Sequence, residues 1–407
     1  MTRPGANEAA QATSVVFEGA TKRYSGQTEP AVDDLSLDVS DGEICVLVGP
    51  SGCGKTTALR MVNRTVELTE GDIRIGETSV KRRQPAELRR EIGYVIQQIG
   101  LFPHRTIAEN IATVPQLLGW EKERCSKRVE ELIDLIGLEP AMRDRYPAQL
   151  SGGQQQRVGV ARALAADPRV MLMDEPFGAV DPIARERLQN EFLRLQREIR
   201  KTVLFVTHDI DEAIKMGDRI AVMRKGGKLA QYATPAELLM NPADDFVEDF
   251  VGADRALKRL ALMRVSDIDL WEAPLAFVGQ ATSEVKGKLE SAEVPHALLV
   301  DSDRRPLGWL SERDLTQGTV PEVPDSGPEP ILDLDDVMRD ALAEIMQSET
   351  HYAPVVDGQR RIAGVLSVEI IQDFLTSPKA AVEEHPAAER PLAEEATAAP
   401  AEYPPGD

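Results

Sequence analysis

Near-continuous apolar runs alternate with amphipathic stretches through the first part of the chain. Three of the runs, residues 44–49, 169–174 and 202–207, have the length and the branched side chains of strands buried on both faces. Residues 55–63 follow the first run, residues 182–200 lie between the other two, and both stretches have helical periodicity. This order predicts strand–helix–strand units and therefore an α/β fold with a parallel sheet.

A second pattern, which occurs twice, lies nearer the end of the chain. The segment HALLVDSDRRPLGWLSERDL begins at His296 and aligns, with a one-residue gap, with HYAPVVDGQRRIAGVLSVEII, which begins at His351. Each copy predicts a strand, a turn, a second strand and the start of a helix, and the matching residues Gly308 and Gly364 are 56 residues apart. A unit this short buries little surface alone, so we expect the two copies to pack together as a pair.

Changes in composition place the boundaries between these regions. From residue 377 the chain is dominated by Ala, Pro and Glu without apolar periodicity, so we expect a solvated, disordered tail. A proline-rich acidic stretch, TVPEVPDSGPEP, separates the two copies of the repeat. The predicted segments are, in order, a flexible N-terminus (1–13), the α/β domain (14–252), the first repeat domain (253–318), the linker (319–330), the second repeat domain (331–376) and the tail (377–407).

The charge of the chain is strongly negative and unevenly distributed. The 68 acidic and 47 basic side chains give a net charge of −21, of which −5 falls on residues 1–252 and −16 on residues 253–407. This balance disfavours binding to nucleic acid, which requires a basic surface. The basic stretch 81–90 is expected to be a solvated face.

Composition excludes further classes of protein. The sequence has no apolar run near the roughly 18–20 residues that cross a bilayer. Its first residues lack the apolar core of a signal peptide. Three cysteines are too few and too scattered for a disulfide framework or a zinc site. We therefore expect a soluble, intracellular protein.

A glycine-rich segment between the first predicted strand and helix carries recognisable chemistry. It fits the pattern G-x-x-x-x-G-K-S/T and consists of Gly49, Pro50, Ser51, Gly52, Cys53, Gly54, Lys55 and Thr56. Glycines let such a loop wrap a phosphate with backbone N–H groups, and the following helix N-terminus adds positive potential. Lys55 would then bridge the β- and γ-phosphates of a nucleotide, and the Thr56 hydroxyl would bind Mg²⁺. The alternative is a glycine-rich turn without a ligand; Cys53 is interpreted as a small filler of the loop.

Two further segments extend this candidate site. The apolar run 170–173 leads into Asp174, a carboxylate suited to Mg²⁺, and Glu175, interpreted as the general base that polarises the attacking water. An apolar strand that ends in Asp-Glu is also common in purely structural roles. A predicted helix over residues 155–166 begins with a second anion-binding segment, made of Leu150, Ser151, Gly152, Gly153 and Gln154.

With these motifs in this order, residues 14–252 resemble the ATPase subunits of ABC transporters, and LSGGQ is similar to the signature of that family. The resemblance implies a P-loop NTPase fold with a RecA-like core, an antiparallel β subdomain and a helical subdomain. It also implies that Tyr24 stacks on adenine and that Gln97 contacts Mg²⁺, water and the membrane partner. Asp181 would belong to the D-loop, and His208 would hold the γ-phosphate. The D-loop reads GAVD instead of the more usual Ser-Ala-Leu-Asp. Taken singly, His208 would be interpreted as a loop histidine and Tyr24 as a core or rim aromatic.

In that family two ATPase subunits pack head to tail, and the resemblance implies the same for this chain. Residues 151–154 of one copy would then cover the ATP held by the phosphate loop, residues 49–57 with Thr57 included, of the other. The implied partners are a second copy of the chain, integral-membrane permease subunits and, indirectly, an extracytoplasmic substrate-binding protein. The implied location is the cytoplasmic face of the plasma (inner) membrane, as a peripheral subunit. The implied cofactors are ATP and Mg²⁺, with the metal held by Thr56, Gln97 and Asp174.

The repeat resembles a tandem pair of CBS domains over about residues 256–376. In CBS pairs that bind adenosine ligands, a Ser or Thr and an Asp three residues later contact phosphate and ribose. The first copy has both, as Ser311 and Asp314, whereas the second copy has Ser367 and Ile370. The alternative is a CBS pair that serves only as a dimer platform.

An ATPase followed by a CBS pair resembles the importers of osmoprotectants such as glycine betaine, proline betaine, carnitine or choline. Their CBS domains are associated with gating by ionic strength or by a nucleotide messenger. An acidic module would respond to salt if screening weakened an inhibitory electrostatic contact. The alternatives are an importer ATPase for another small solute such as an amino acid, a soluble ABC ATPase of DNA repair or translation, and a regulatory binding module with a vestigial ATPase.

Overall fold

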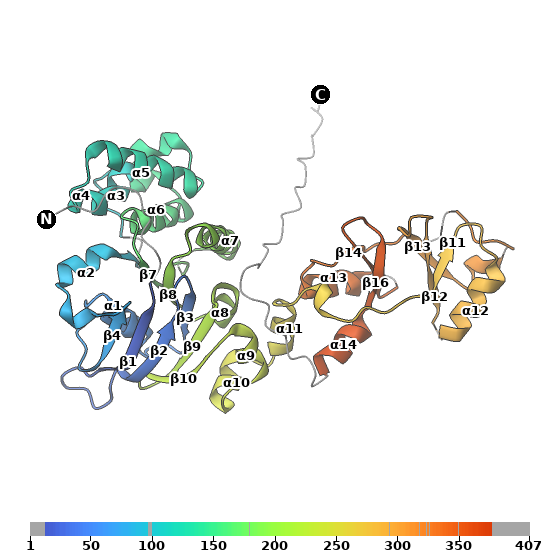
Figure 1. Cartoon of the computed structure of the whole chain (residues 1–407), viewed down its shortest axis with the longest axis horizontal. Helices are drawn as coiled ribbons and strands as arrows, with labels where there is room; N and C mark the ends of the chain where they lie inside the picture. The colour runs from blue at the N-terminus through green and yellow to red at the C-terminus, as the bar shows by residue number, and fades with distance from the viewer. Residues whose placement is uncertain are drawn as a thin grey trace, which may run out of the picture. The chain divides into compact units, whose positions relative to one another are not determined.

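The computed structural model of the chain describes residues 13–376, except for 97–99, 179, 293, 317, 323, 325 and 349. It divides after Gly252 into two compact units, both drawn in Figure 1. In the described residues we find no helix with the length and apolar content of a transmembrane span.

Six strands form the central sheet of the first unit and are, in sheet order, β10 (Lys228–Ala233), β9 (Arg219–Arg224), β3 (Ile44–Val48), β8 (Thr202–Val206), β7 (Val170–Asp174) and β6 (Ile92–Val95). Neighbouring strands are parallel except β10 and β9, which pair antiparallel at one edge. Every residue of β3, β7 and β8 is buried, as expected for apolar runs covered on both faces. The predicted parallel α/β layer is confirmed.

Helices connect these strands, as parallel pairing requires. The connecting helices are α1 (Lys55–Val62) after β3, α2 (Pro85–Glu91) before β6, α7 (Pro182–Ile199) between β7 and β8, and α8 (Ile210–Met216) between β8 and β9. Two more helices, α9 (Pro235–Met240) and α10 (Asp245–Val251), follow the last strand, β10. The Asp181 side chain caps the start of α7, and Arg200 ends it in the left-handed conformation. The helix predicted over residues 182–200, between the strands now seen as β7 and β8, is therefore confirmed.

A second sheet of the first unit is antiparallel, and its strands are, in order, β2 (Val32–Val39), β1 (Val15–Lys22), β4 (Glu70–Ile75) and β5 (Thr78–Ser79). Its apolar side chains, among them Phe17 and Leu35, share one core with Leu59 of α1 and Leu172 of the parallel sheet. This shared core fixes α1, and with it the loop that precedes α1, between the two sheets.

A group of helices is inserted between β6 and β7 and comprises α3 (Ile107–Ile111), α4 (Thr113–Leu117), α5 (Lys122–Leu135) and α6 (Gly152–Leu164). It appears at the top of the first unit in Figure 1. The last of these helices begins at Gly152, three residues before the predicted start at residue 155. The reason is that Ser151 and Gln154 form a capping box, which lets two glycines lie inside the first helical turn.

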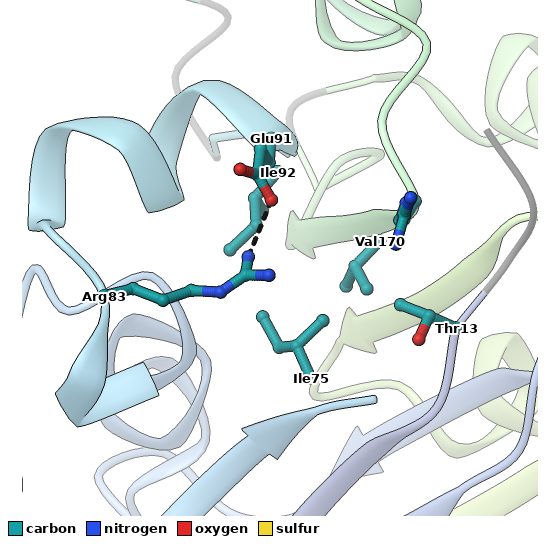
Figure 2. Close-up of a pocket in the computed structure, with 7 residues that line it drawn as sticks. Thr13, Ile75, Arg83, Glu91, Ile92 and Val170 are labelled. Carbon is teal, nitrogen blue, oxygen red and sulfur yellow. Dashed lines mark hydrogen bonds and ion pairs between the residues drawn. The ribbon is translucent and has the colours of Figure 1, made fainter. Parts of the chain in front are cut away.

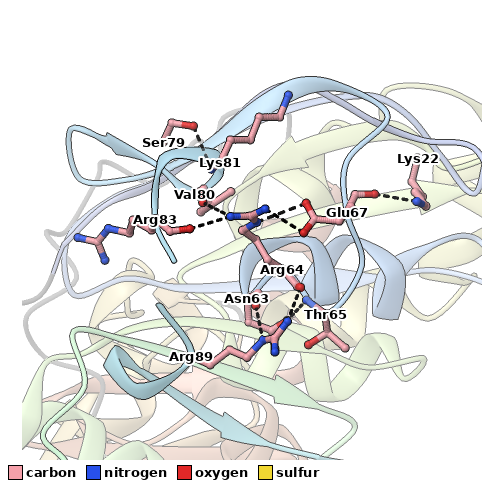
Figure 3. A network of polar contacts seen from close by, with 10 residues as sticks. All are labelled: Lys22, Asn63, Arg64, Thr65, Glu67, Ser79, Val80, Lys81, Arg83 and Arg89. Carbon is pink, nitrogen blue, oxygen red and sulfur yellow. Dashed lines mark hydrogen bonds and ion pairs between the residues drawn. The ribbon is translucent and has the colours of Figure 1, made fainter. Parts of the chain in front are cut away.

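Arginine side chains hold the end of α1 (Figure 3). Arg64 has a positive φ of 53° and donates to the carbonyl oxygen of Arg83 at 2.7 Å. Arg89 of α2 donates to the carbonyl oxygens of Asn63 at 3.1 Å and Arg64 at 2.6 Å. Helix ends leave such carbonyls without intrahelical partners. The stretch 81–90 therefore ties α2 to α1. Its residues Lys81, Arg82, Arg89 and Arg90 are also exposed, as expected for a solvated face.

The second unit contains two three-stranded sheets, with β11 (Leu275–Phe277), β12 (His296–Val300) and β13 (Pro306–Ser311) in one and β14 (Leu332–Asp333), β15 (Tyr352–Val356) and β16 (Ile362–Ser367) in the other. In each sheet the first pair is parallel and the second pair is antiparallel. The helices α12 (Thr282–Ala292) and α13 (Met338–Gln347) occupy equivalent places in the two copies. The sequence repeat is thus also a structural repeat. The copies differ after the last strand, where the second continues as α14 (Val368–Thr376) and the first makes only a 3-10 turn at Asp314–Thr316.

The structural limits of the two repeats differ from the predicted domain boundaries. The helix α11 (Arg255–Leu260) packs against α13, and Leu260 lies in the core of the second repeat. Val320 lies in the core of the first repeat, although it belongs to the segment 319–330 that we expected to be a linker. Both segments carry apolar residues that gain by burial. Val320 extends the core of the repeat that precedes it, whereas Leu260 joins the core of the repeat farther along the chain.

Candidate functional site

The loop between β3 and α1 is shaped by glycines near its two ends. Gly49 and Gly54 have φ values of 151° and 100°. A Cβ atom at Gly49 would lie 2.2 Å from the carbonyl oxygen of Met223, and one at Gly54 would lie 2.1 Å from that of Ala31. Because only glycine fits at both positions, the loop folds tightly around the start of α1, where backbone N–H groups favour an anion.

Lys55, the first residue of α1, is only 6% exposed. Its Nζ donates to the carbonyl oxygens of Gly49 at 2.7 Å and Pro50 at 3.1 Å, and lies 3.7 Å from Sγ of Cys53. Cys53 is fully buried in the same loop. Neutral carbonyl partners leave the ammonium its full positive charge, so the loop combines a cation with a helix N-terminus at one place.

Thr56 and Asp174 come from different elements and meet at the carboxyl end of the parallel sheet. The Thr56 hydroxyl on α1 donates at 2.9 Å to Oδ1 of Asp174, the last residue of β7. Burial raises the pKa of the Asp174 carboxyl, while the hydrogen bond from Thr56 acts to lower it. A hydroxyl oxygen and a carboxylate oxygen side by side are the hard ligands that Mg²⁺ prefers. These two residues therefore fit the metal expected there.

Two residues that sequence reasoning missed complete the surroundings of Asp174. Nη2 of Arg60 lies 3.8 Å from Oδ2 of Asp174, and the Tyr94 hydroxyl is near enough for both groups to shift its pKa. Burial raises the pKa of the Tyr94 hydroxyl, and Arg60 opposes that shift. Arg60 stands one helical turn after Thr56, and Tyr94 stands opposite Leu172 in the β6–β7 register. The helical spacing from Thr56 could have identified Arg60 from the sequence, whereas Tyr94 could be identified only once the register of β6 against β7 was known.

Glu175 and His208 meet beyond the ends of the neighbouring strands β7 and β8. Nδ1 of His208 lies 3.3 Å from Oε1 of Glu175, and the Glu175 N–H donates to the carbonyl oxygen of Val206 at 2.9 Å. Glu175 has a positive φ of 45°. The histidine side chain is 60% exposed and the glutamate side chain 22%. The pair thus places a proton acceptor and an imidazole together where water has access.

The LSGGQ segment starts α6 and satisfies its own helix end. Oγ of Ser151 accepts from the N–H of Gln154 at 3.3 Å, and Oε1 of Gln154 accepts from the N–H of Ser151 at 2.9 Å. Leu150 is buried, whereas Ser151 and Gly152 are exposed. Within the described part of the chain, no hydrogen bond or ion pair joins this segment to the phosphate loop.

Two further residues assigned by resemblance, Tyr24 and Asp181, have separate surroundings. Tyr24 is exposed, and Nζ of Lys22 lies 5.1 Å from its ring centre. Oδ1 of Asp181 accepts from the N–H of Ala184 at 3.0 Å, so this side chain caps α7. Gln97 lies outside the described residues.

In the second unit, Ser311 and Asp314 bind each other. Oδ2 of Asp314 accepts from the Ser311 N–H at 2.6 Å and from its hydroxyl at 2.8 Å. In the second copy, Oγ of Ser367 accepts from the N–H of Ile370 at 3.3 Å, and no carboxylate stands at the Asp314 position. Sequence reasoning missed His296, which stands opposite Ser311 in the β12–β13 register. Burial lowers the pKa of His296, and the charge of Asp314 opposes that shift.

A small pocket lies at the other end of the parallel sheet (Figure 2) and is lined by Thr13, Ile75, Arg83, Glu91, Ile92, Arg169 and Val170. Arg83 and Glu91 form an ion pair of 2.6 Å beside it. Ile92 and Val170 begin β6 and β7, whereas Asp174 ends β7. Ligands of open parallel sheets bind beyond the carboxyl ends of the strands, so this pocket is not part of the candidate site.

Comparisons with known proteins agree with this geometry. A family model described as ABC transporter matches residues 32–178. The osmoprotectant import ATP-binding protein OsmV of Salmonella typhimurium is 47% identical over 89% of this chain and 96% of its own length. The choline transport ATP-binding protein OpuBA of Bacillus subtilis is 43% identical over 89% of this chain and 97% of its own length. The solved structure of cbiO1 from Clostridium perfringens, part of the ABC transporter complex cbiONQ, is 25% identical with a TM-score of 0.53, covering 61% of this chain and 94% of that one. The chain therefore belongs to the ATP-binding subunits of ABC transporters, in the group that includes osmoprotectant and choline importers.

Proposed function

We propose that this chain hydrolyses ATP to power uptake of a quaternary-amine osmoprotectant: glycine betaine, carnitine, choline or proline betaine. The relatives support the substrate class, since OsmV is named for osmoprotectant import and OpuBA for choline transport. The carnitine transport ATP-binding protein OpuCA of Listeria monocytogenes is also 44% identical over 88% of this chain. The solute itself would cross through the permease subunits.

The ATPase reaction is supported above all by two contacts at the carboxyl ends of β7 and β8, the one between Thr56 and Asp174 and the one between Glu175 and His208. Thr56 and Asp174 would hold Mg²⁺, which neutralises phosphate charge when bound. Glu175 would take the proton of the attacking water, because its carboxylate lies at a place that water reaches. His208, 3.3 Å away, would donate to the γ-phosphate and orient the base.

The nucleotide itself would be bound by residues around the phosphate loop. The backbone N–H groups of this loop and the Lys55 ammonium would contact the phosphates, and Tyr24 would stack on adenine. The chain has one phosphate loop and one LSGGQ segment, and the described residues show no bond between them. We therefore assign residues 150–154, together with Asp181, to the ATP of a second copy packed head to tail.

The other proposed partners, permease subunits and a substrate-binding protein, follow from the chain being one subunit of a transporter. Gln97 would face permease subunits in the membrane, and an extracytoplasmic binding protein would deliver the solute to them. The chain would then sit as a peripheral subunit on the cytoplasmic face of the plasma (inner) membrane.

The second unit would regulate the transporter as a CBS pair. Its two copies share one topology, which supports a paired module, and residues 253–407 carry a charge of −16. A phosphate-bearing ligand at Ser311 and Asp314 or a response to ionic strength would provide the signal. Deleting residues 253–407 is expected to remove the salt dependence of glycine betaine uptake by vesicles that carry the whole transporter; unchanged salt dependence would contradict this role.

ATP hydrolysis by the purified chain with Mg²⁺ tests the enzymatic function. Glu175→Gln is expected to abolish turnover while retaining ATP binding, and to accumulate an ATP-bound dimer on size-exclusion chromatography. Undiminished turnover of this variant would overthrow the assignment of Glu175 as the base.

A further inference from the structure

A buried polar network connects the segment that begins α7 with the segment that begins α8. Arg185 and Gln189 are one helical turn apart on α7 and share a face. Nη2 of Arg185 donates to the carbonyl oxygen of Val180 at 3.1 Å, next to Asp181. One end of the network thus holds the D-loop.

The other end of the network holds the segment that carries His208. Oε1 of Glu212 on α8 accepts from Nε2 of Gln189 at 3.0 Å. The Thr207 side chain is near enough to the Glu212 carboxylate to lower its pKa. Oγ1 of Thr207 in turn accepts from the N–H of Asp209 at 3.1 Å. Thr207 and Asp209 flank His208, so Glu212 joins α7 to both neighbours of that histidine.

The network is buried and contains a carboxylate. Thr207, Gln189 and Glu212 are only 1%, 5% and 8% exposed. Burial raises the pKa of Glu212, while the hydrogen bonds of Thr207 and Gln189 and the charge of Arg185 oppose the shift. An apolar side chain would pack two helices without this desolvation cost. The carboxylate instead binds a donor on α7 and lies beside the segment that carries His208.

We propose that Glu212 is a positioning residue that holds α7, and with it the D-loop at the start of α7, in one fixed arrangement with the His208 loop. The inference rests on the proposed function, in which Asp181 faces the second copy and His208 faces the γ-phosphate. Under that function, contact of the second copy with the D-loop would fix the position of His208 in the same chain. Glu212 is not among the residues assigned to the nucleotide and would act only through its neighbours.

The test compares Glu212→Gln with Glu186→Gln in the full-length chain. Glutamine keeps the size of the side chain but turns an N–H₂ group toward donors and removes the attraction to Arg185. We expect kcat for ATP hydrolysis to fall about tenfold, or 1.4 kcal/mol, with KM for ATP changed less than about twofold. Glu186 is the matched control, because it also spans α7 and α8, 3.7 Å from Lys215, but its side chain is 71% exposed. Its variant should keep wild-type kinetics.

A double-mutant cycle with Asp181→Ala separates positioning from general destabilisation. If Glu212 acts through the arrangement of the two loops, its substitution should lower kcat much less in the Asp181→Ala background than in the wild type. Additive losses, or kinetics of Glu212→Gln equal to those of Glu186→Gln, would overturn the proposal. If Glu212→Gln does not fold, Gln189→Met replaces it in the same cycle and is expected to lower kcat about threefold, by loss of one hydrogen bond. A wild-type chain without ATPase activity would instead contradict the proposed function.

Discussion

The two units of the chain differ in what they bury. In the described residues of the first unit the buried charged side chains are Lys55, Asp174, Lys201 and Glu212. The buried polar side chains described in the second unit are neutral and are Thr282 and Ser367. Burying a charge destabilises a protein unless its partners are well placed. The first unit therefore bears this cost at Lys55 and Asp174 of its ATP site, whereas the described carboxylates of the second unit keep at least part of their surface in solvent, where a charge costs less.

The largest expected effect tests whether the buried charge of Lys55 serves chemistry. Lys55→Met keeps the apolar stem and removes the ammonium, so ATP hydrolysis should fall about 100-fold or more, as when a preorganised donor to a transition state is lost. The melting temperature should stay the same or rise, because a buried charge has been removed. Phosphate release and calorimetry measure the two effects. Lys225→Met, at an exposed lysine, is the control. Wild-type turnover in Lys55→Met would contradict the view that the first unit buries this charge for the sake of its chemistry.

The next effect tests whether the second unit is held by packing alone. Trp309 is almost fully buried between the two repeats, and its Nε1 has no partner in the described structure. Trp309→Ala should destabilise this unit by about 3–5 kcal/mol, seen as an earlier, separate transition on heating. Trp309→Phe, which loses area but no hydrogen bond, should cost about 1–2 kcal/mol. Basal ATP hydrolysis at low salt should be unchanged in both. A joint transition of the two units would show that their stabilities are not separate.

Local patterns predicted the elements that depend on local burial. The strands β3, β7 and β8 were predictable because an apolar run over residues such as 202–206 reports that both faces are covered. The start of α6 was placed three residues late, because Gly152 and Gly153 disfavour a helix until Ser151 and Gln154 cap it.

Contacts between distant segments were harder to predict. Thr56 and Asp174 lie in recognisable motifs, so their meeting could be expected from the sequence. Tyr94 lies near Asp174 only because β6 pairs with β7, and the sequence around Tyr94 does not indicate how these two strands align. The packing of α11 on the second repeat depends in the same way on which core is open, and the sequence placed it with the first.

A smaller effect tests the surroundings of Asp174. Arg60 is half exposed, so its attraction to Asp174 is partly screened, and Arg60→Gln should lower kcat only about two- to fivefold. Arg60 acts to lower the pKa of Asp174, so its loss should raise that pKa. Asp174 must be ionised to bind Mg²⁺, hence the fall of activity toward acid should begin at higher pH and be relieved by more Mg²⁺. Arg60→Lys, which keeps the charge, should behave closer to the wild type. A pH profile identical to that of the wild type would show that Arg60 does not act on Asp174.

The smallest effects compare the two copies of the repeat. Ser311→Ala removes the hydrogen bond from the hydroxyl to the Asp314 carboxylate, and Ser367→Ala removes the acceptor at the start of α14. Each should cost about 1 kcal/mol of stability, measured by chemical denaturation. On stability alone the two copies should therefore look alike.

Ligand binding should separate the copies where stability does not. AMP is a suitable probe, because it lacks the β- and γ-phosphates that the loop at Lys55 would hold, and calorimetry on the full-length chain measures it directly. If the first copy binds phosphate and ribose through Ser311 and Asp314, then Ser311→Ala should weaken AMP binding about tenfold, as loss of a hydrogen bond to a charged group implies. Ser367→Ala should leave binding unchanged, since the second copy has Ile370 where the first has a carboxylate. Equal weakening in both variants would contradict the difference between the copies. Absence of AMP binding to the wild type would leave this unit as a packing module without an adenosine site, which is what its neutral interior already resembles.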